Sequence, residues 1–366
     1  MKRILWVMPA LQGGGAERMT INLVEHLSLY FKIKLVLIKN IIEYDTPPLL
    51  KENIKSLGHK KLPLKLCYLS PGVLNSLILQ AKTSDLVVGG LELSPTYVSF
   101  LTAKLAGRPF LSIVHSVLSE HITYSPLSFI HFPLCKNIYK NCNQIIAVSN
   151  SVGNDLYKHF GIKEKKLKII LNPINIKYVQ EMALAEPDLN LNKNNYLVSV
   201  GRLSRQKGFD ILIKAFSKMA PETRPDLIIL GEGSERASLS NLIKRLGLSK
   251  WVYMPGFIKN PYSIISRARA FVFPSRYEGF GIALLEAMAC GIPIVASQIS
   301  PIEEVCGKDG AIYFPPGNEE ALSQAIVKIS KDNTLRKNLI DIGLKRAKKL
   351  DIEKVAEKYR EIFNNI

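Results

Sequence analysis

The chain lacks the marks of several common protein classes. Its five cysteines are odd in number and scattered, with no Cys-x-x-Cys pair and no regular spacing to a histidine, so we expect reduced, non-metallic thiols. No stretch reaches the ~20 apolar residues that a membrane-spanning helix needs. The longest candidate, residues 283–296, is interrupted by Glu286, Gly291 and Pro293. The apolar run near the N-terminus is too short for a signal peptide and predicts a buried strand.

Several ligand-binding fingerprints are missing as well. Glu17 and Arg18 stand where a dinucleotide-binding Gly-x-Gly-x-x-Gly would place its last glycine, and no Gly-Lys-Ser/Thr follows for a Walker loop. The chain has no Asp-x-Asp, so a metal-bridged diphosphate is not expected. It also has no zinc-finger spacing, no RNP-type aromatic motif and no arginine-rich tail, so we expect no nucleic-acid partner despite a formal charge of +18.

The positive charge is unevenly spread. Residues 1–172 hold 21 of the 49 basic side chains but only 10 of the 31 acidic ones, which fits anionic lipid or a phosphorylated substrate. Two stretches, residues 49–66 and 122–139, interleave or border apolar side chains with lysines. This pattern is typical of a peripheral membrane surface and also of ordinary half-buried helices. Because the excess charge gathers in the front half, we favour the membrane surface.

The pattern of apolar runs predicts an α/β protein with two domains, which suits 366 residues of which 47% are hydrophobic. Short apolar strands alternate with helical stretches, as in parallel-sheet βα units. The strands are expected at residues 3–8, 34–38, 85–89, 109–114, 144–148 and 168–171, then at 196–200, 227–230, 251–254, 270–274, 292–296 and 311–314. The polar, Asn-rich residues 172–195 are expected to link the domains. Residues 332–366 are helical in pattern and either close the second domain or cross back to the first.

Two glycine-containing turns follow expected strands. Gly13-Gly14-Gly15 opens a helix, where backbone N–H groups bind phosphate, although a tight turn without a ligand has the same sequence. Arg202 and Lys207, in the run from residue 201 to 208, leave another strand at its carboxyl end. A guanidinium fork and a point charge suit a diphosphate, and a solvated basic loop is the alternative.

A third motif carries two carboxylates. Glu278 precedes a helix of Ala, Leu and Met, and Glu286 follows eight positions later inside that helix. A carboxylate on so apolar a helix needs a partner. The vicinal hydroxyls of a ribose or a hexose would donate to it, and a structural ion pair is the other possibility.

Taken together, the motifs resemble those of glycosyltransferase family 4. They are the Glu-x7-Glu from Glu278 to Glu286, the Gly-Arg-Leu-x-x-x-Lys-Gly run at 201–208, Gly-Glu-Gly at 231–233 and Gly-Gly-Ala-Glu-Arg at 14–18. The resemblance implies a GT-B fold, in which two Rossmann-like, doubly wound domains face each other across a cleft. Residues 1–172 would bind the acceptor and residues 173–349 the nucleotide sugar, with a C-terminal helix at 350–366 packing back on the first domain.

The resemblance also assigns roles to residues. Glu286 would hold the ribose, Arg202 with Lys207 the diphosphate, and Glu278 the donor sugar. His115, at the end of a front-domain strand, would stabilise positive charge on the sugar. The expected catalytic set is His115, Glu278, Arg202 and Lys207. The expected donor-binding set is Gly14, Gly15, Arg202, Lys207, Ile258, Glu278, Gly279, Phe280, Gly281 and Glu286.

The implied activity is retaining transfer of a hexose or N-acetylhexosamine to a lipid-linked, lipopolysaccharide or polysaccharide hydroxyl. Asn260-Pro261-Tyr262 resembles the sequence of family members that use uridine diphosphate sugars, and this resemblance favours UDP over GDP as the nucleotide. No cofactor and no metal are expected, and the expected location is the cytoplasm, peripheral on the inner face of the cell membrane. The alternatives are a nucleotide-sugar epimerase of GT-B fold and a non-catalytic binding protein.

Overall fold

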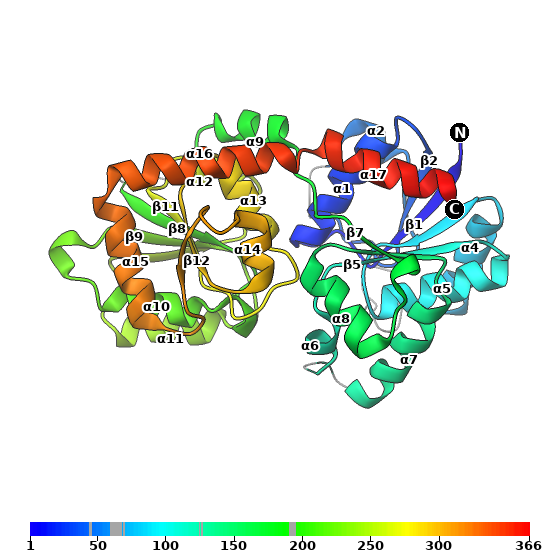
Figure 1. The fold of residues 1–366 in the computed structure, drawn as a ribbon, viewed down its shortest axis with the longest axis horizontal. Helices are drawn as coiled ribbons and strands as arrows, with labels where there is room; N and C mark the ends of the chain where they lie inside the picture. Colours follow the sequence, from blue (N-terminus) through cyan, green and yellow to red (C-terminus); the bar gives the residue numbers. More distant parts are fainter. Residues whose placement is uncertain (44–45, 59–67, 69, 124, 126, 190–194) are drawn as a thin grey trace. The chain divides into compact units, whose positions relative to one another are not determined.

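The computed structural model describes all residues except 44–45, 59–67, 69, 124, 126 and 190–194. It divides into two compact units (Figure 1): unit 1 is Met1–Pro173 with Ile352–Ile366, and unit 2 is Ile174–Asp351. The boundary expected after residue 172 therefore lies next to the observed one. The C-terminal helix belongs to unit 1, whereas residues 350 and 351 belong to unit 2.

The described residues of unit 1 form a seven-stranded sheet in the order β3-β2-β1-β4-β5-β6-β7, and all its strand pairs are parallel. The strands are β1 (Arg3–Met8), β2 (Lys32–Leu37), β3 (Ile54–Ser56), β4 (Leu86–Gly89), β5 (Phe110–Val114), β6 (Gln144–Ala147) and β7 (Leu167–Ile169). The edge strand β3 was not expected, because residues 49–66 were interpreted as an amphipathic surface stretch. Within that stretch Leu50 is fully buried, and residues 59–66 lie outside the described residues.

Helices cover both faces of this sheet (Figure 1). They are α1 (Gly15–Leu27), α2 (Pro48–Lys51), α4 (Pro71–Lys82), α5 (Ser94–Ala106), α6 (Leu118–Thr123), α7 (Ser128–Asn141), α8 (Asn150–Phe160) and α17 (Ile352–Asn365). The last helix, α17, packs beside α1: Phe363 is fully buried against the rings of Trp6 and Phe31. Lys2 Nζ also donates to the Phe363 carbonyl at 2.8 Å. These contacts anchor the end of the chain in unit 1.

The described residues of unit 2 form a six-stranded parallel sheet in the order β10-β9-β8-β11-β12-β13. Its strands are β8 (Tyr196–Val200), β9 (Asp226–Leu230), β10 (Val252–Gly256), β11 (Ala270–Phe273), β12 (Ile294–Ser297) and β13 (Ile312–Phe314). Its helices are α9 (Ile176–Ala183), α10 (Phe209–Ser217), α11 (Arg236–Arg245), α12 (Tyr262–Ile265), α13 (Ile282–Ala289), α14 (Ser300–Cys306), α15 (Glu319–Lys331) and α16 (Asn333–Lys349). Leu197, Phe216 and Ile326 lie in the core that β8, α10 and α15 enclose.

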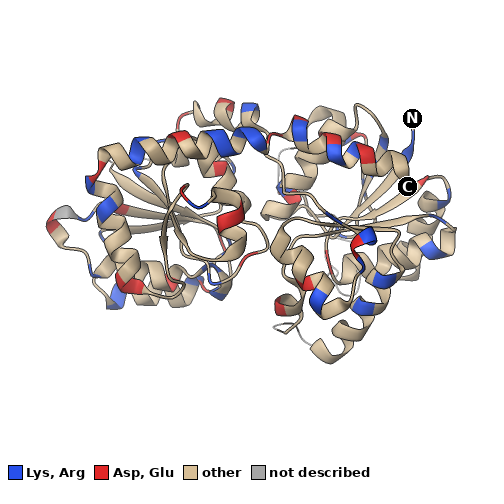
Figure 2. Ribbon diagram, viewed as in Figure 1, with Lys and Arg blue, Asp and Glu red and all other residues tan. Residues whose placement is uncertain are grey.

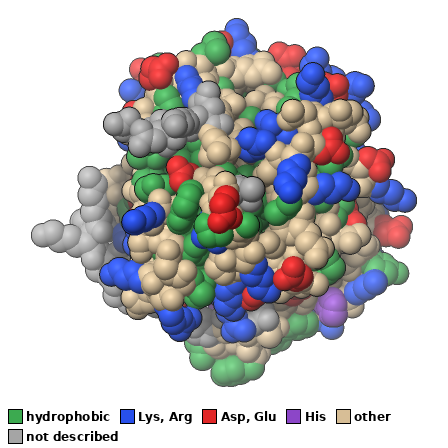
Figure 3. All heavy atoms as spheres, turned by 90° about the vertical axis from the view of Figure 1, so that its left-hand side faces the viewer, with side chains coloured by type: hydrophobic (Ala, Val, Ile, Leu, Met, Phe, Trp, Pro, Cys, Tyr) green, Lys and Arg blue, Asp and Glu red, His purple; other side chains and the backbone are tan. Residues whose placement is uncertain are grey.

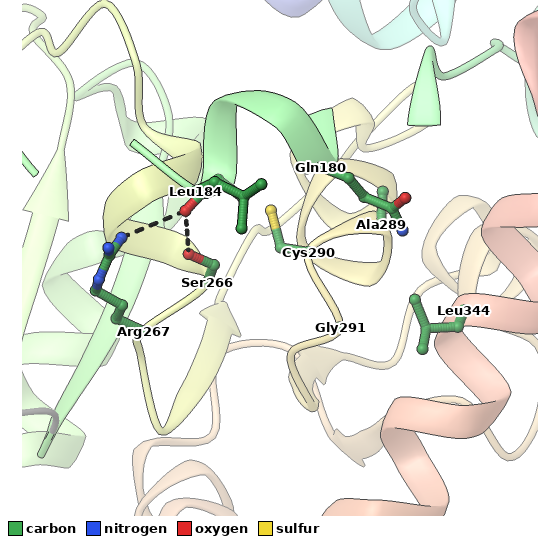
Figure 4. Close-up of a pocket in the computed structure, with 9 residues that line it drawn as sticks. Gln180, Leu184, Ser266, Arg267, Ala289, Cys290, Gly291 and Leu344 are labelled. Carbon is green, nitrogen blue, oxygen red and sulfur yellow. Dashed lines mark hydrogen bonds between the residues drawn. The ribbon is translucent and has the colours of Figure 1, made fainter. Parts of the chain in front are cut away.

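Residues 172–195 are not a linker throughout, as the sequence had predicted, because Ile176–Ala183 forms helix α9 within unit 2. The Ser266 hydroxyl and the Arg267 guanidinium both donate to the Ala183 carbonyl at the end of α9 (Figure 4), at 3.2 and 3.3 Å. These two side chains line an open cavity of about 530 Å³ that Leu184 and Cys290 also line. The polar side of this cavity thus serves to hold α9.

Charged side chains are distributed over both units. Figure 2 shows a series of Lys and Arg along α16, and on the face turned to the viewer in Figure 3 basic and acidic side chains are interspersed. No helix within the described part of the chain is long and apolar enough to cross a membrane.

In each sheet the strand order reverses next to the first strand of the unit. The reversal lies between β1 and β4 in unit 1 and between β8 and β11 in unit 2. In doubly wound sheets, ligands bind outside the carboxyl ends of the strands at this point. The loops that leave these strands therefore define the two places where a site is expected.

Candidate functional site

In unit 2, the loops that follow β8 and β11 meet through an ion pair. Lys207 Nζ donates to Glu278 Oε1 at 2.5 Å, and the Ser275 hydroxyl donates to the same oxygen at 2.7 Å. The Glu278 side chain is 6% exposed and that of Lys207 is 20% exposed. The Lys207 ammonium also lies 5.2 Å from the centre of the Phe273 ring. Two residues that were predicted from separate motifs, 71 positions apart, are thus in direct contact.

Glycines allow the backbones to approach closely here. Gly208 has a φ of +66°, and a Cβ at this position would lie 2.1 Å from the Pro274 carbonyl oxygen. Gly231, with a φ of +139°, would place a Cβ 2.0 Å from the Gly201 carbonyl oxygen. A side chain at either position would force these loops apart.

Glu286 lies on α13, buried to all but 7% of its surface. The hydroxyl of Tyr262, on α12, donates to Glu286 Oε1 at 2.7 Å. The sequence pointed to sugar hydroxyls or an ion pair as the partner of this carboxylate, and the structure provides a tyrosine. A carboxylate accepts up to about four hydrogen bonds, so the tyrosine and a ribose diol are compatible partners.

The remaining donor-site candidates of unit 2 lie in the loops that follow β8, β10 and β11. Gly279 and Phe280 are buried, and Gly281 caps the N-terminus of α13 with a φ of +97°. Arg202 is exposed in the loop after β8, and Ile258 is half-buried in the loop after β10. Backbone N–H groups at the N-terminus of a helix and a nearby cation suit a diphosphate.

In unit 1, the N-terminus of α1 already faces a carboxylate. Gly14 is the N-cap residue and Gly15 the first helical residue. A Cβ on Gly14 would lie 2.1 Å from Glu17 Oε2, so the Glu17 side chain lies against this turn. A phosphate approaching Gly14 and Gly15 would require Glu17 to turn aside, because two anions would otherwise compete for the same N–H groups.

His115 follows β5 and is held by a carboxylate that the sequence did not single out. Glu92 Oε2 accepts the His115 backbone N–H at 3.1 Å, and Oε1 accepts the Ser116 hydroxyl and lies 3.5 Å from His121 Nδ1. Glu92 lies in the loop after β4, three positions past Gly89, as an acidic residue between two leucines. That position at a strand end was the available signal.

The pKa values of this cluster are shifted by burial and charge. Burial raises the pKa of Glu92, but the hydrogen bonds and charges of His121, His115 and Ser116 outweigh it and bring the pKa down to about 2. Burial lowers the pKa of His115, against the opposing effects of the Glu92 carboxylate and the Gly90 backbone. At neutral pH, Glu92 is therefore ionised and His115 is neutral.

Nothing among the described residues gathers three or more His, Cys, Asp or Glu side chains in a group that could hold a metal ion.

Comparisons with known proteins show which family and which fold the chain shares. A family model described as Glycosyltransferase Family 4 matches residues 13–178, and one described as Glycosyl transferases group 1 matches residues 184–346. An N-acetylgalactosaminyltransferase of Campylobacter jejuni that acts on a diphospho-undecaprenol-linked sugar is 28% identical over 355 residues, 95% of each chain. The O-antigen chain mannosyltransferase RfbU of Salmonella typhimurium is 30% identical over 222 residues, 60% of each chain.

Solved structures give the same fold. HepE of Anabaena, in complex with UDP and glucose, superposes with a TM-score of 0.84 at 20% identity over 100% of both chains. WaaG, a glycosyltransferase involved in lipopolysaccharide biosynthesis, superposes with a TM-score of 0.78 at 17% identity, over 98% of this chain and 99% of that one. The protein has a GT-B fold. It is a glycosyltransferase and belongs to glycosyltransferase family 4.

Proposed function

We propose that the chain is a retaining glycosyltransferase that moves a hexose or an N-acetylhexosamine from a nucleotide sugar, with UDP favoured, to a hydroxyl of a lipid-linked, lipopolysaccharide or polysaccharide acceptor. The observation that carries the donor half of this proposal is the contact of Lys207 with Glu278, both nearly buried where β8 and β11 end. A buried cation at a switch point suits a diphosphate, and the carboxylate beside it suits sugar hydroxyls.

The relatives support the choice of donor and acceptor. HepE binds UDP and UDP-glucose, and the Campylobacter transferase uses an undecaprenol-linked acceptor. In this proposal Glu286 holds the ribose, with Tyr262 occupying part of its carboxylate. Ile258 contacts the base, and Gly14 with Gly15 contacts phosphate.

The proposed reaction is a same-face substitution. The bond between the anomeric carbon and the leaving phosphate oxygen breaks while the acceptor oxygen bonds to the same face of that carbon, and the acceptor proton passes to the leaving diphosphate. Arg202 and Lys207 stabilise the charge that grows on the diphosphate. Glu278 binds the sugar rather than attacking it, because Lys207 and Ser275 both donate to its Oε1 and lower its nucleophilicity. His115, which is neutral and whose backbone N–H is held by Glu92, stabilises the positive charge on the sugar.

Since two basic side chains supply the positive charge, we propose that the transfer needs no divalent cation. Activity that is unchanged in EDTA and unaffected by added Mg²⁺ or Mn²⁺ would agree with this. Activity that is abolished by EDTA and restored by one of these ions would contradict it.

We also propose that unit 1 binds an anionic membrane surface through the first turns of α7. Leu127, Phe129 and Ile130 are 59%, 73% and 45% exposed, and Lys136 and Lys140 follow on the same helix and are also exposed. Apolar side chains inserted among lipid headgroups add to the attraction of about 1 kcal/mol for each lysine near an anionic surface.

Co-sedimentation with vesicles of phosphatidylglycerol and phosphatidylcholine tests this surface. Phe129→Ser together with Ile130→Ser should lower the bound fraction, and Leu184→Ser, which removes a hydrophobic side chain that is 82% exposed in unit 2, is the matched control. Binding that is equal in all three proteins, or equal on pure phosphatidylcholine, would contradict the proposal.

A transfer assay tests the proposed reaction itself. UDP-hexoses and UDP-N-acetylhexosamines are incubated with undecaprenyl-diphosphate-linked sugars, and the anomeric configuration of the product is read by NMR. The proposal predicts a product with the α configuration of the donor. Glu286→Ala should form no product, and Glu320→Gln, which changes an exposed carboxylate on α15, is the control. A β-linked product would overturn the retaining mechanism.

A further inference from the structure

The loops that carry Lys207 and Glu278 are joined by a second ion pair, on which none of the predicted roles depends. Arg276 Nη1 and Nη2 donate to Asp210 Oδ1 and Oδ2, each at 2.8 Å. This is a bidentate pair between the β11 loop and the first turn of α10. Such pairs fix orientation as well as distance, because both partners are planar.

The same arginine also binds the turn that contains Lys207. Arg276 Nη1 donates to the Arg205 carbonyl at 2.8 Å, and the Arg276 backbone N–H donates to the Gln206 carbonyl at 2.8 Å. In return, Gln206 Nε2 donates to the Tyr277 carbonyl at 3.0 Å. Every residue of the 3-10 turn Arg205–Lys207 is thus bound to the segment 276–278.

The pair remains ionised in the folded protein. Burial raises the pKa of Asp210, but the hydrogen bonds and charge of Arg276 outweigh it and the pKa is lowered. Asp210 also lies in the first turn of α10, where the helix dipole favours a negative charge. The fork is therefore complete at neutral pH.

We propose that Arg276 and Asp210 are positioning residues that hold the Lys207 ammonium where it binds the diphosphate of the donor. The proposal rests on the proposed function of Lys207. A lysine side chain has a flexible four-carbon stem, so the place of its ammonium depends on how firmly its backbone turn is held. The Arg276 fork connects that turn to the strand end on which Glu278 lies.

An ordinary stabilising ion pair would behave differently. The side chains of Arg276 and Asp210 are 31% and 35% exposed, and exposed pairs contribute little to stability. Lys214, one turn further along α10, forms such a pair with Glu319 of α15 at 3.2 Å, with side chains 42% and 28% exposed. Lys214 acts on Asp210 only through its charge, so Lys214→Leu removes an ion pair of the same helix and leaves the hydrogen bonds of Arg276 in place, which makes it the matched control for Arg276→Leu.

Calorimetric titration with UDP and with uridine separates the two roles. In Arg276→Leu and in Asp210→Asn we expect the affinity for UDP to fall about tenfold, the loss of one charge-assisted hydrogen bond, while the affinity for uridine stays within about twofold. Arg276→Lys, which keeps the charge but not the fork, should give an intermediate loss. Lys214→Leu should keep the wild-type ratio of the affinity for UDP to the affinity for uridine.

The outcomes distinguish this inference from the proposed function. If Lys207→Ala loses the preference for UDP over uridine but both Arg276→Leu and Asp210→Asn keep it, the positioning role is wrong and the diphosphate site stands. If the wild type shows no preference, the diphosphate site is wrong and the positioning role falls with it. Melting temperatures are measured in parallel to show which variants fold. Should Arg276→Leu not fold, the result for Asp210→Asn, which keeps the side-chain volume, tests the positioning role.

Discussion

The contact between Lys207 and Glu278 allows stability and activity to be separated. Lys207→Met removes the cation and leaves a carboxylate that is 94% buried with Ser275 as its remaining partner, since the Glu278 side chain is 6% exposed. Breaking a buried ion pair costs about 3–5 kcal/mol, and the partial exposure of Lys207 places this case at about 3 kcal/mol. For a unit of this size the melting temperature should fall by roughly 6–12 °C.

Glu278→Gln in the same chain should restore much of that stability, because a neutral amide is left where an unpaired charge would be. We expect the double variant Lys207→Met with Glu278→Gln to lie about 1 kcal/mol below the wild type, so that adding Glu278→Gln to Lys207→Met regains about 2 kcal/mol and the two destabilisations do not add. Transfer activity should nevertheless be lost in both single variants and in the double variant, because both side chains are proposed to contact the donor.

Thermal melting and initial rates of transfer, measured on all four proteins, complete the cycle. Destabilisations that simply add would show that the buried charge is not the source of the cost. A double variant that regained activity together with stability would show that the pair is structural and does not contact the donor.

Three further predictions follow from the structure. Tyr262→Phe removes the hydrogen bond to Glu286, so the KM for the nucleotide sugar should rise about tenfold and the preference for UDP over 2′-deoxy-UDP should narrow; an unchanged preference would contradict a ribose role. Because the pKa of Glu92 is lowered from 4.5 to about 2, its contribution to stability is present above pH 4.5 and lost as the pH falls toward 2. Glu92→Gln should therefore remove this pH-dependent part of the free energy of unfolding of unit 1, measured in urea between pH 2 and pH 4.5. A pH profile that is the same in the variant and the wild type would refute this role of Glu92. Gly231→Ala adds a Cβ 2.0 Å from a carbonyl oxygen at a φ of +139°, so its melting temperature should fall by several degrees, whereas alanine at the unobstructed Gly72, where the nearest atom is 3.7 Å away, should have little effect.

The strands that the sequence predicted best are those made of continuous apolar residues. β1 and β8 were predicted with their observed bounds, because runs such as Ile-Leu-Trp-Val-Met are buried on both faces of a parallel sheet. β3 was missed because residues 54–56 form a short edge strand with an exposed lysine at its centre. α9 was missed because asparagines and prolines flank its eight residues, and its place depends on Arg267 and Asn260, which are distant in the sequence.

The motifs predicted which residues lie at the strand ends but not how they pair. The contact of Lys207 with Glu278 joins residues from two different βα units, and it depends on the neighbouring order of β8 and β11. Glu92 was overlooked because its significance comes from His115, 23 positions later. The tyrosine that binds Glu286 lies 24 positions before it on another helix. Such partners are brought together by the fold, and the local spacing of residues in the sequence does not predict them.

The most direct test of the proposed donor site is a thermal-shift panel of UDP-, GDP-, ADP- and dTDP-sugars on the wild type, Glu286→Ala and Lys207→Ala. A ligand at about 100 times its Kd stabilises the folded state by about 2.7 kcal/mol. That should raise the melting temperature of the wild type by roughly 5–11 °C. We predict this rise with UDP-sugars and its loss in both variants. A rise that persists in Glu286→Ala and Lys207→Ala, or no rise with any nucleotide sugar, would contradict the proposed donor site.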